Sequence, residues 1–206
     1  MVYHTESSTH KDLWATNKDL NVLRQRLLDL FCQLAYQEGD FVLSSGARSS
    51  YYINGKEVTL HPQGALAIGR LLLNMLPSGT QAVAGLTLGA DPIVSAVSVV
   101  STLENRPIPA LIVRKEAKGH GTKAYVEGPN LPEAAKIVVL EDVVTTGRSA
   151  MKAVTRLRDA SYTVDRVISL IDRKQGGEEY YKSVDLQFQA VFSITEIQER
   201  YKQISD

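Results

Sequence analysis

Short apolar runs alternate with helical patterns through the second half of the chain. Four of these runs have the length and composition of buried strands, at 82–85, 110–113, 137–140 and 164–171. Segments with a helical spacing of apolar residues lie between them, at 92–103 and 147–160. Strand, helix and strand in alternation is the pattern of a parallel sheet with helices on its faces. The sequence therefore predicts an α/β fold with a central parallel sheet flanked by helices.

The segments on either side of this region predict further elements around the sheet. Leu20, Leu23 and Leu27 begin a helical stripe over 19–37, and Gly39 is placed to end that helix. We also expect two strands, a helix opened by Pro62, a late strand and a final helix, at 41–43, 50–58, 61–76, 186–192 and from 195.

The composition excludes several classes of protein. Lys plus Arg and Asp plus Glu both number 23, so the formal net charge is zero and no global field attracts nucleic acid or an anionic membrane. No apolar run approaches the roughly 20 residues that span a bilayer, and the polar start lacks the apolar stretch of a secretory signal. The one cysteine, Cys32, cannot form an intrachain disulfide, which favours a reducing compartment such as the cytoplasm.

The segment after the third apolar run has the chemistry of a phosphate site. Two carboxylates, Glu141 and Asp142, follow the strand, and a loop rich in hydroxyl groups and glycine leads into the next helix. A helix N-terminus offers free N–H groups to a phosphate, and Gly147 lets the backbone approach it closely. The carboxylates repel phosphate but can accept hydrogen bonds from sugar hydroxyls or face a cation. A plain β–α turn with Thr and Ser as helix caps is the alternative.

A second segment, at 113–123, follows the strand at 110–113 and is rich in charge and glycine. Such a segment can close as a lid over an oligophosphate. The alternative is a solvated basic loop, which is common for runs of this kind. Its cationic or titratable side chains include Arg114, Lys115, Lys118 and His120.

The run from 137 to 150 resembles the phosphoribosyl pyrophosphate (PRPP) motif of type I phosphoribosyltransferases: a hydrophobic run, two acids, a hydrophobic pair, Thr, a small residue and Gly. By this resemblance, Glu141 and Asp142 bind the ribose hydroxyls and the loop after them binds the 5-phosphate. The motif residues implied in PRPP binding are Glu141, Asp142, Val143, Val144, Thr145, Thr146, Gly147, Arg148 and Ser149.

The charged segment resembles the Arg-Lys-x-x-Lys-x-His-Gly loop of orotate phosphoribosyltransferases, which other phosphoribosyltransferases lack. The resemblance implies that Arg114, Lys115, Lys118 and His120 contact pyrophosphate, and that Lys118, His120 and Asp142 act in catalysis. It also implies a homodimer in which part of this loop reaches the neighbour's active site. The implied ion is Mg²⁺, carried in by the diphosphate rather than held by a protein metal site.

Three more segments are similar to the same family, at 41–52, 85–92 and 169–173. They correspond to a turn that lines the orotate pocket, a loop beneath the pyrophosphate, and a strand end whose arginine meets orotate. By this resemblance Arg173, Thr145 and the backbone around Tyr52 contact orotate. The chain departs from many family members at Ser44 and Gly89, where those members have substrate-binding lysines.

The resemblance implies the type I phosphoribosyltransferase fold for all 206 residues, as one domain. A core covers 61–171, and a small hood with flanking elements is formed by the N-terminal and C-terminal segments 17–60 and 172–206. From its polar composition we expect residues 1–16 to form a flexible tail, with Trp14 docking on the body.

The implied activity is the transfer of the 5-phosphoribosyl group from PRPP to orotate, which gives orotidine 5′-monophosphate and pyrophosphate in de novo pyrimidine (UMP) biosynthesis. One alternative is a regulator of this fold that binds PRPP as an effector and controls transcription. The zero net charge and the lack of a helix-turn-helix pattern disfavour it. The other is an enzyme of the same type acting on another base, which Arg173 and the Lys118-Gly-His-Gly sequence disfavour.

Overall fold

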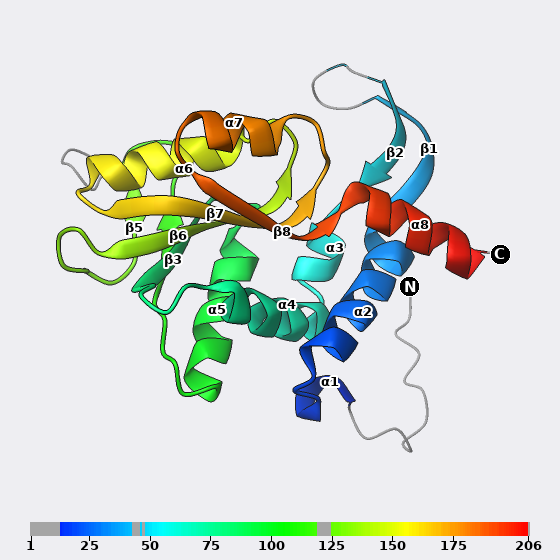
Figure 1. Cartoon of the computed structure of the whole chain (residues 1–206), viewed down its shortest axis with the longest axis horizontal. Helices are drawn as coiled ribbons and strands as arrows, with labels where there is room; N and C mark the ends of the chain where they lie inside the picture. The colour runs from blue at the N-terminus through cyan, green and yellow to red at the C-terminus, as the bar shows by residue number, and fades with distance from the viewer. Residues whose placement is uncertain (1–12, 43–45, 47, 119–124, 206) are drawn as a thin grey trace.

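The computed structural model describes residues 13–42, 46, 48–118 and 125–205. Its centre is a six-stranded sheet with the strand order β5-β4-β3-β6-β7-β8 (Figure 1). β4 and β5 are antiparallel, and all other neighbours are parallel, so the predicted α/β architecture is confirmed with one antiparallel edge strand. The strands are β3 (Ala82–Leu86), β4 (Ala110–Val113), β5 (Val126–Glu127), β6 (Lys136–Val144), β7 (Thr163–Asp172) and β8 (Gln187–Ser193).

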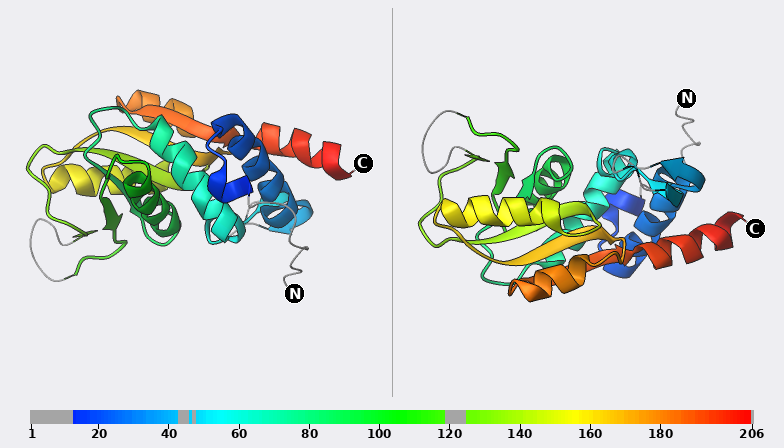
Figure 2. Two further views of the ribbon diagram at one scale, coloured as in Figure 1. Left: turned by 90° about the horizontal axis from the view of Figure 1, so that it is seen from below. Right: turned by 90° about the horizontal axis from the view of Figure 1, so that it is seen from above.

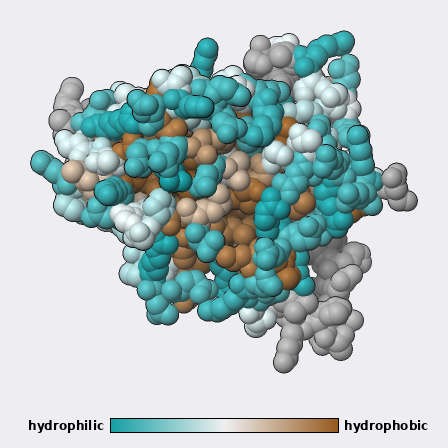
Figure 3. All heavy atoms as spheres, viewed as in Figure 1, coloured by the Kyte–Doolittle hydropathy of each residue, from teal (hydrophilic) through white to brown (hydrophobic). Residues whose placement is uncertain are grey.

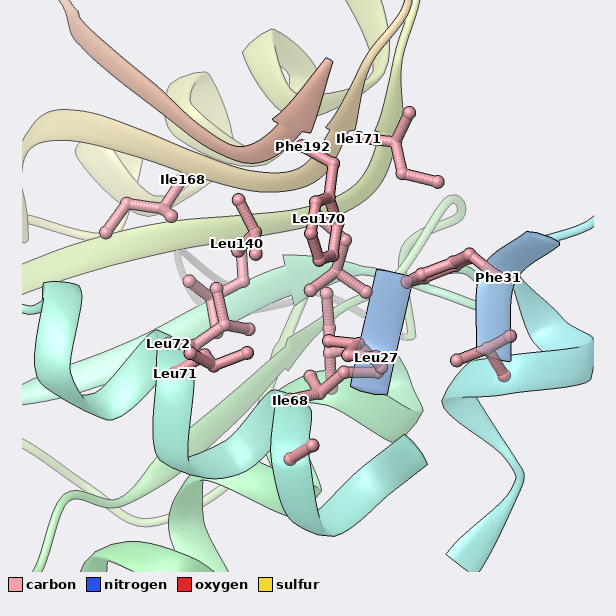
Figure 4. Close-up of a cluster of buried hydrophobic side chains, with 14 of the residues drawn as sticks. Leu27, Phe31, Ile68, Leu71, Leu72, Leu140, Ile168, Leu170, Ile171 and Phe192 are labelled. Atoms are coloured by element: carbon pink, nitrogen blue, oxygen red, sulfur yellow. The ribbon is translucent and has the colours of Figure 1, made fainter. Parts of the chain in front are cut away.

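Helices cover both faces of the sheet (Figure 2). On one face, α2 (Leu20–Leu30), α4 (Pro62–Met75) and α5 (Asp91–Leu103) bury their apolar stripes against the strands. Figure 4 shows this core, where Leu72 of α4 points toward Leu140 of β6. On the other face, α6 (Arg148–Asp159) and α7 (Gly177–Ser183) pack a second core that includes Tyr181. The sequence analysis did not predict α7.

An antiparallel hairpin of β1 (Tyr36–Val42) and β2 (Arg48–Ile53) stands beside the sheet. The predicted helix over 19–37 is confirmed over α2 and the π-helical turn η1 (Phe31–Ala35). Its predicted end is wrong, because η1 leads directly into β1 and Gly39 lies within that strand. Tyr36 is buried, pairs with Ile53 and packs on the ring of Tyr51. This tertiary packing outweighs the helical pattern of the sequence.

β6 is longer than the predicted strand at 137–140. Its parallel ladder with β7 continues from the Glu141–Ser169 pair to the Val144–Asp172 pair. Backbone hydrogen bonds do not depend on the side chain, so the ladder extends through the two acids where the apolar pattern stops. Glu141 and Asp142 therefore lie within the strand rather than after it, and the rigid sheet fixes their positions.

Three short or terminal helices complete the described chain, α1 (Leu13–Thr16), α3 (Lys56–Thr59) and α8 (Ile194–Ser205). Trp14 packs against the first core, and Arg70 donates hydrogen bonds to the carbonyls of Trp14, Ala15 and Asn17. The rest of the expected tail lies outside the described residues, and the division into core and hood stays a prediction. Figure 3 shows mostly polar side chains on one face, with apolar ones gathered near its middle. Among the described residues, no helix has the length and apolar character needed to cross a bilayer.

Candidate active site

The carboxyl ends of β3, β6 and β7 meet at one edge of the sheet, because these neighbouring strands run parallel. Open α/β sheets bind their ligands at this edge. The sequence-predicted segments follow these strands: the loop 87–90 after β3, the loop 145–147 after β6, and Arg173 directly after β7. The structure therefore brings together segments that are far apart in the chain.

The loop after β6 forms a small cavity of about 70 Å³ at the start of α6. Gly147 caps this helix with a φ of 79°, in the left-handed region that favours glycine. A Cβ atom at Gly147 would lie 2.9 Å from Cζ of Tyr181, so only glycine fits without a shift. The cavity is lined by Glu141, Val143, Val144, Thr145, Thr146, Gly147, Arg148, Ser149, Ala150 and Tyr181. The structure thus collects the predicted phosphate-binding loop around one concave site at a helix N-terminus.

Asp142 lies between two glycines from other segments. A Cβ atom at Gly89 would come within 2.8 Å of its Oδ1, and one at Gly55 within 3.9 Å of its Oδ2. The backbone N–H of Val143 donates to Oδ1 at 2.9 Å. The carboxylate is only partly buried, so it can accept hydrogen bonds from a ligand. Gly89, where many family members have lysine, here leaves room for this carboxylate.

Glu141 is buried, with 6% of its surface exposed. Burial, followed by the charge of Asp142 and a hydrogen bond with Asp142, raises the pKa of Glu141 well above the ordinary carboxyl value, while the charge of Lys115 lowers it. Within the described part of the chain, neither Oε2 of Glu141 nor the hydroxyl of Tyr181 has a hydrogen-bond partner. An unpaired buried polar group costs about 1–3 kcal/mol, which a ligand hydroxyl or cation near Glu141 would offset.

The described part of the charged segment begins where β4 ends. The N–H of Arg114 donates to the carbonyl of Tyr125 at 2.8 Å, which brings both ends of the segment together. Glu127 on β5 forms ion pairs with Arg114 at 3.2 Å and with Lys118 at 3.6 Å. Sequence reasoning missed this acidic partner. His120 lies outside the described residues, as does Ser44.

Arg173 contacts the β1–β2 hairpin through Tyr51. Its Nε donates to the Tyr51 hydroxyl at 2.9 Å, and its guanidinium carbon lies 4.8 Å from the centre of the Tyr51 ring. Successive side chains of a strand point to opposite faces, and Tyr52 instead packs near Phe41 and is 43% exposed. The side chain that meets Arg173 is therefore that of Tyr51, which the sequence analysis did not single out. The alternation of side-chain direction along β2 is the sequence feature that could have pointed to Tyr51.

The described residues contain no group of three or more His, Cys, Asp or Glu side chains that could hold a metal ion. Glu141 and Asp142 are two adjacent hard oxygen donors, and such a pair suits Mg²⁺, which takes most of its ligands from phosphate and water. The site therefore fits an ion that arrives with a diphosphate.

Known proteins resemble this chain over most or all of its length. No protein-family model matches it. The orotate phosphoribosyltransferase of Nostoc sp. is 73% identical over 206 residues, which is all of both chains. Two crystal structures of Mycobacterium tuberculosis orotate phosphoribosyltransferase are similar to it. The complex with Fe(III) dicitrate has a TM-score of 0.76 at 34% identity, over 85% of this chain and 98% of the other. The complex with 5-phospho-α-D-ribosyl 1-diphosphate has a TM-score of 0.71 at 31% identity, over 85% and 99%.

Proposed function

The chain belongs to the orotate phosphoribosyltransferase family, and we propose roles for its site residues in the reaction of that family. It transfers the 5-phosphoribosyl group of PRPP to orotate and releases pyrophosphate. One observation carries these roles: the acid pair, the phosphate-type loop and Arg173 meet at one edge of the sheet. Transfer of a phosphoribosyl group to a planar base requires these three kinds of group in one place.

The loop after β6 binds the 5-phosphate of PRPP. Thr145, Thr146 and Ser149 supply hydroxyl groups, and the first turn of α6 supplies backbone N–H groups. Asp142 accepts hydrogen bonds from ribose hydroxyls, and Glu141, which lines the cavity, accepts a further one. Together these contacts hold the sugar by both ends, so that the anomeric carbon is fixed relative to the sheet.

The charged segment stabilises the departing pyrophosphate. As the bond from the anomeric carbon to pyrophosphate stretches, negative charge grows on the leaving group and positive charge on the sugar ring. Arg114, Lys115 and Lys118 come from the described part of this segment, and by resemblance His120 joins them. Cations fixed in position before the reaction stabilise developing negative charge without reorganisation, which is often the largest single contribution to catalysis.

Orotate binds between Arg173 and the hairpin. A guanidinium presents a planar set of donors that matches the planar oxygen acceptors of this base. Thr145 and the backbone near Tyr52 complete the proposed base contacts. As the bond from the anomeric carbon to pyrophosphate breaks, the ring nitrogen N1 of orotate bonds to that carbon and loses its proton to pyrophosphate or solvent. The product is orotidine 5′-monophosphate.

We propose Mg²⁺ as the cofactor, next to Glu141 and Asp142. When bound with the diphosphate, Mg²⁺ neutralises charge on the phosphate oxygens. The carboxylate of Asp142 supports this placement, because it is partly exposed and can face a cation or its water ligands.

A direct assay tests the function and the metal together. The ultraviolet absorbance of orotate at the long-wavelength edge of its band should fall when the protein is mixed with PRPP and Mg²⁺, because attachment of the ribose to N1 changes the absorption of the pyrimidine ring. Excess chelator should abolish the change, and fresh Mg²⁺ should restore it. An unchanged absorbance with folded protein would contradict the function, whereas activity that survives the chelator would contradict only the metal proposal.

The homodimer is a proposal supported by the family resemblance. If the charged segment serves the neighbouring site, a Lys118→Ala chain and an Asp142→Asn chain should each lose activity and recover part of it when mixed. Random exchange makes half of the dimers mixed, each with one native site, so about a quarter of the native activity should return. The absence of recovery after exchange has been verified by mass spectrometry would show that each chain uses its own segment.

We propose a cytoplasmic location, supported by the cysteine content. Cys32 is buried, and burial, followed by the charge of Asp29, raises the pKa of its thiol to about 11. The thiol is therefore protonated near neutral pH and unreactive, as suits a structural cysteine.

A further inference from the structure

Arg156 on α6 contacts both ends of the charged segment. One nitrogen of its guanidinium donates to the carbonyl of Arg114, and the other donates to the carbonyl of Lys115 at 2.7 Å. Its guanidinium carbon also lies 4.1 Å from the centre of the Tyr125 ring. Arg114 and Lys115 directly follow β4, and Tyr125 directly precedes β5. One side chain therefore joins the two ends of the connection between these strands.

These contacts lie where the sheet ladder stops supporting the backbone. The pairs between β4 and β5 end at Val113 and Val126, and one more hydrogen bond joins Arg114 to Tyr125. Beyond this point the carbonyls of Arg114 and Lys115 need donors from elsewhere. The planar fork of an arginine can supply two donors at fixed spacing, which the single ammonium of a lysine cannot.

α6 links this contact to the phosphate-type loop. The helix begins at Arg148, directly after that loop, and reaches Arg156 two turns later, a rise of about 12 Å. An α-helix of this length, packed on the sheet through Ala153 and Leu157, behaves as a rigid rod. The same element therefore sets the position of the 5-phosphate site and of the segment that carries Arg114 and Lys115.

We propose that Arg156 is a positioning residue, which fixes the backbone of Arg114 and Lys115 and so places the cations of the charged segment for contact with pyrophosphate. This inference rests on the proposed role of the charged segment. Arg156 acts through its two carbonyl contacts and the Tyr125 ring and does not touch the substrate. Displacement of a catalytic group by about 1 Å can cost roughly a hundredfold in rate.

The test compares Arg156→Met and Arg156→Lys with Lys152→Met. Lys152 is an exposed residue of the same helix, one turn earlier, and its replacement removes the same charge. Arg156→Met should lower kcat by about tenfold to a hundredfold. It should also weaken inhibition by pyrophosphate, while the KM for orotate stays within about twofold. Arg156→Lys should recover only part of the loss, and Lys152→Met should match the native protein.

Two readouts do not depend on turnover. Hydrogen exchange at the Arg114 amide should speed up in Arg156→Met, because that amide bonds to Tyr125, whose ring Arg156 covers. Calorimetric binding of pyrophosphate should weaken in parallel. Native-like kinetics and pyrophosphate binding in Arg156→Met would overturn the inference, whether or not exchange changes. If the native protein binds pyrophosphate but does not consume orotate, the proposed function fails while the binding comparison still decides the role of Arg156.

Discussion

Replacing Arg173 by alanine is expected to raise the Michaelis constant for orotate by roughly tenfold to a hundredfold, the range for losing hydrogen bonds to a charged group. The constant for PRPP should change far less, because Asp142 and the phosphate loop belong to β6 and the segment directly after it, not to β7. Orotate differs from uracil by a carboxylate, and Arg173 is the cation at the end of β7 that the hairpin holds in place. Steady-state kinetics with each substrate varied in turn measure both constants.

Arg173→Ala should also weaken the discrimination between orotate and uracil. A site built to pair buried polar groups rejects an analogue that leaves them unpaired by up to roughly 10⁴-fold, so uracil should be a very poor substrate of the native protein. Tyr51→Phe is the matched control, since it removes the hydroxyl that accepts from Arg173 and keeps the ring beneath it. Its effect should be smaller than that of Arg173→Ala. If Arg173→Ala binds orotate as well as the native protein does, the base is held by other groups.

Replacing Lys118 by alanine should lower turnover by about tenfold to a thousandfold, the scale for losing one donor to a transition state. The thermal stability should hardly change, because the side chain is 71% exposed and its ion pair with Glu127 is correspondingly weak. Glu127 keeps its second partner, Arg114, in the variant. Turnover at saturating substrates and the melting temperature separate the two effects.

Lys182→Ala is a suitable control for this variant. Lys182 is an exposed lysine on α7, so its loss changes the net charge equally without touching the charged segment. His120→Ala should lower turnover in the same way, by the family resemblance. Turnover close to native in both Lys118→Ala and His120→Ala would mean that the segment is only a solvated surface loop.

The strands and helices of the second half were largely predictable because their patterns are local. The strand at 110–113 coincides with β4, and the helices expected at 92–103 and 147–160 match α5 and α6 to within a residue at each end. Buried parallel strands need continuous apolar runs, and amphipathic helices need an apolar stripe, so residue order alone reports both. The acid pair and the loop 145–149 were recognisable for the same reason, since their residues are contiguous.

Predictions failed where distant packing decided the local structure. The helical stripe after Asp19 continues past Leu30 in the sequence, but Tyr36 is buried between the rings of Tyr51 and Tyr201 and belongs to β1. β6 runs through two acids because β7 continues its ladder beside it. In both places the packing partner that fixes the backbone lies elsewhere in the chain. The pattern of neighbouring residues therefore cannot predict its effect.

The sequence by itself determined the fold class and the phosphate-type loop, because contiguous residue types encode periodicity and hydrogen-bonding capacity. Only the tertiary structure decided which side chains orient those groups. Tyr51 meets Arg173 across 122 positions, and Arg156 meets Arg114 across 42. Such pairs form because the sheet order brings strand ends together and rigid packing leaves each side chain few positions. The candidate site residues are therefore recognisable in the sequence, whereas the residues that hold them in place depend on the packed fold.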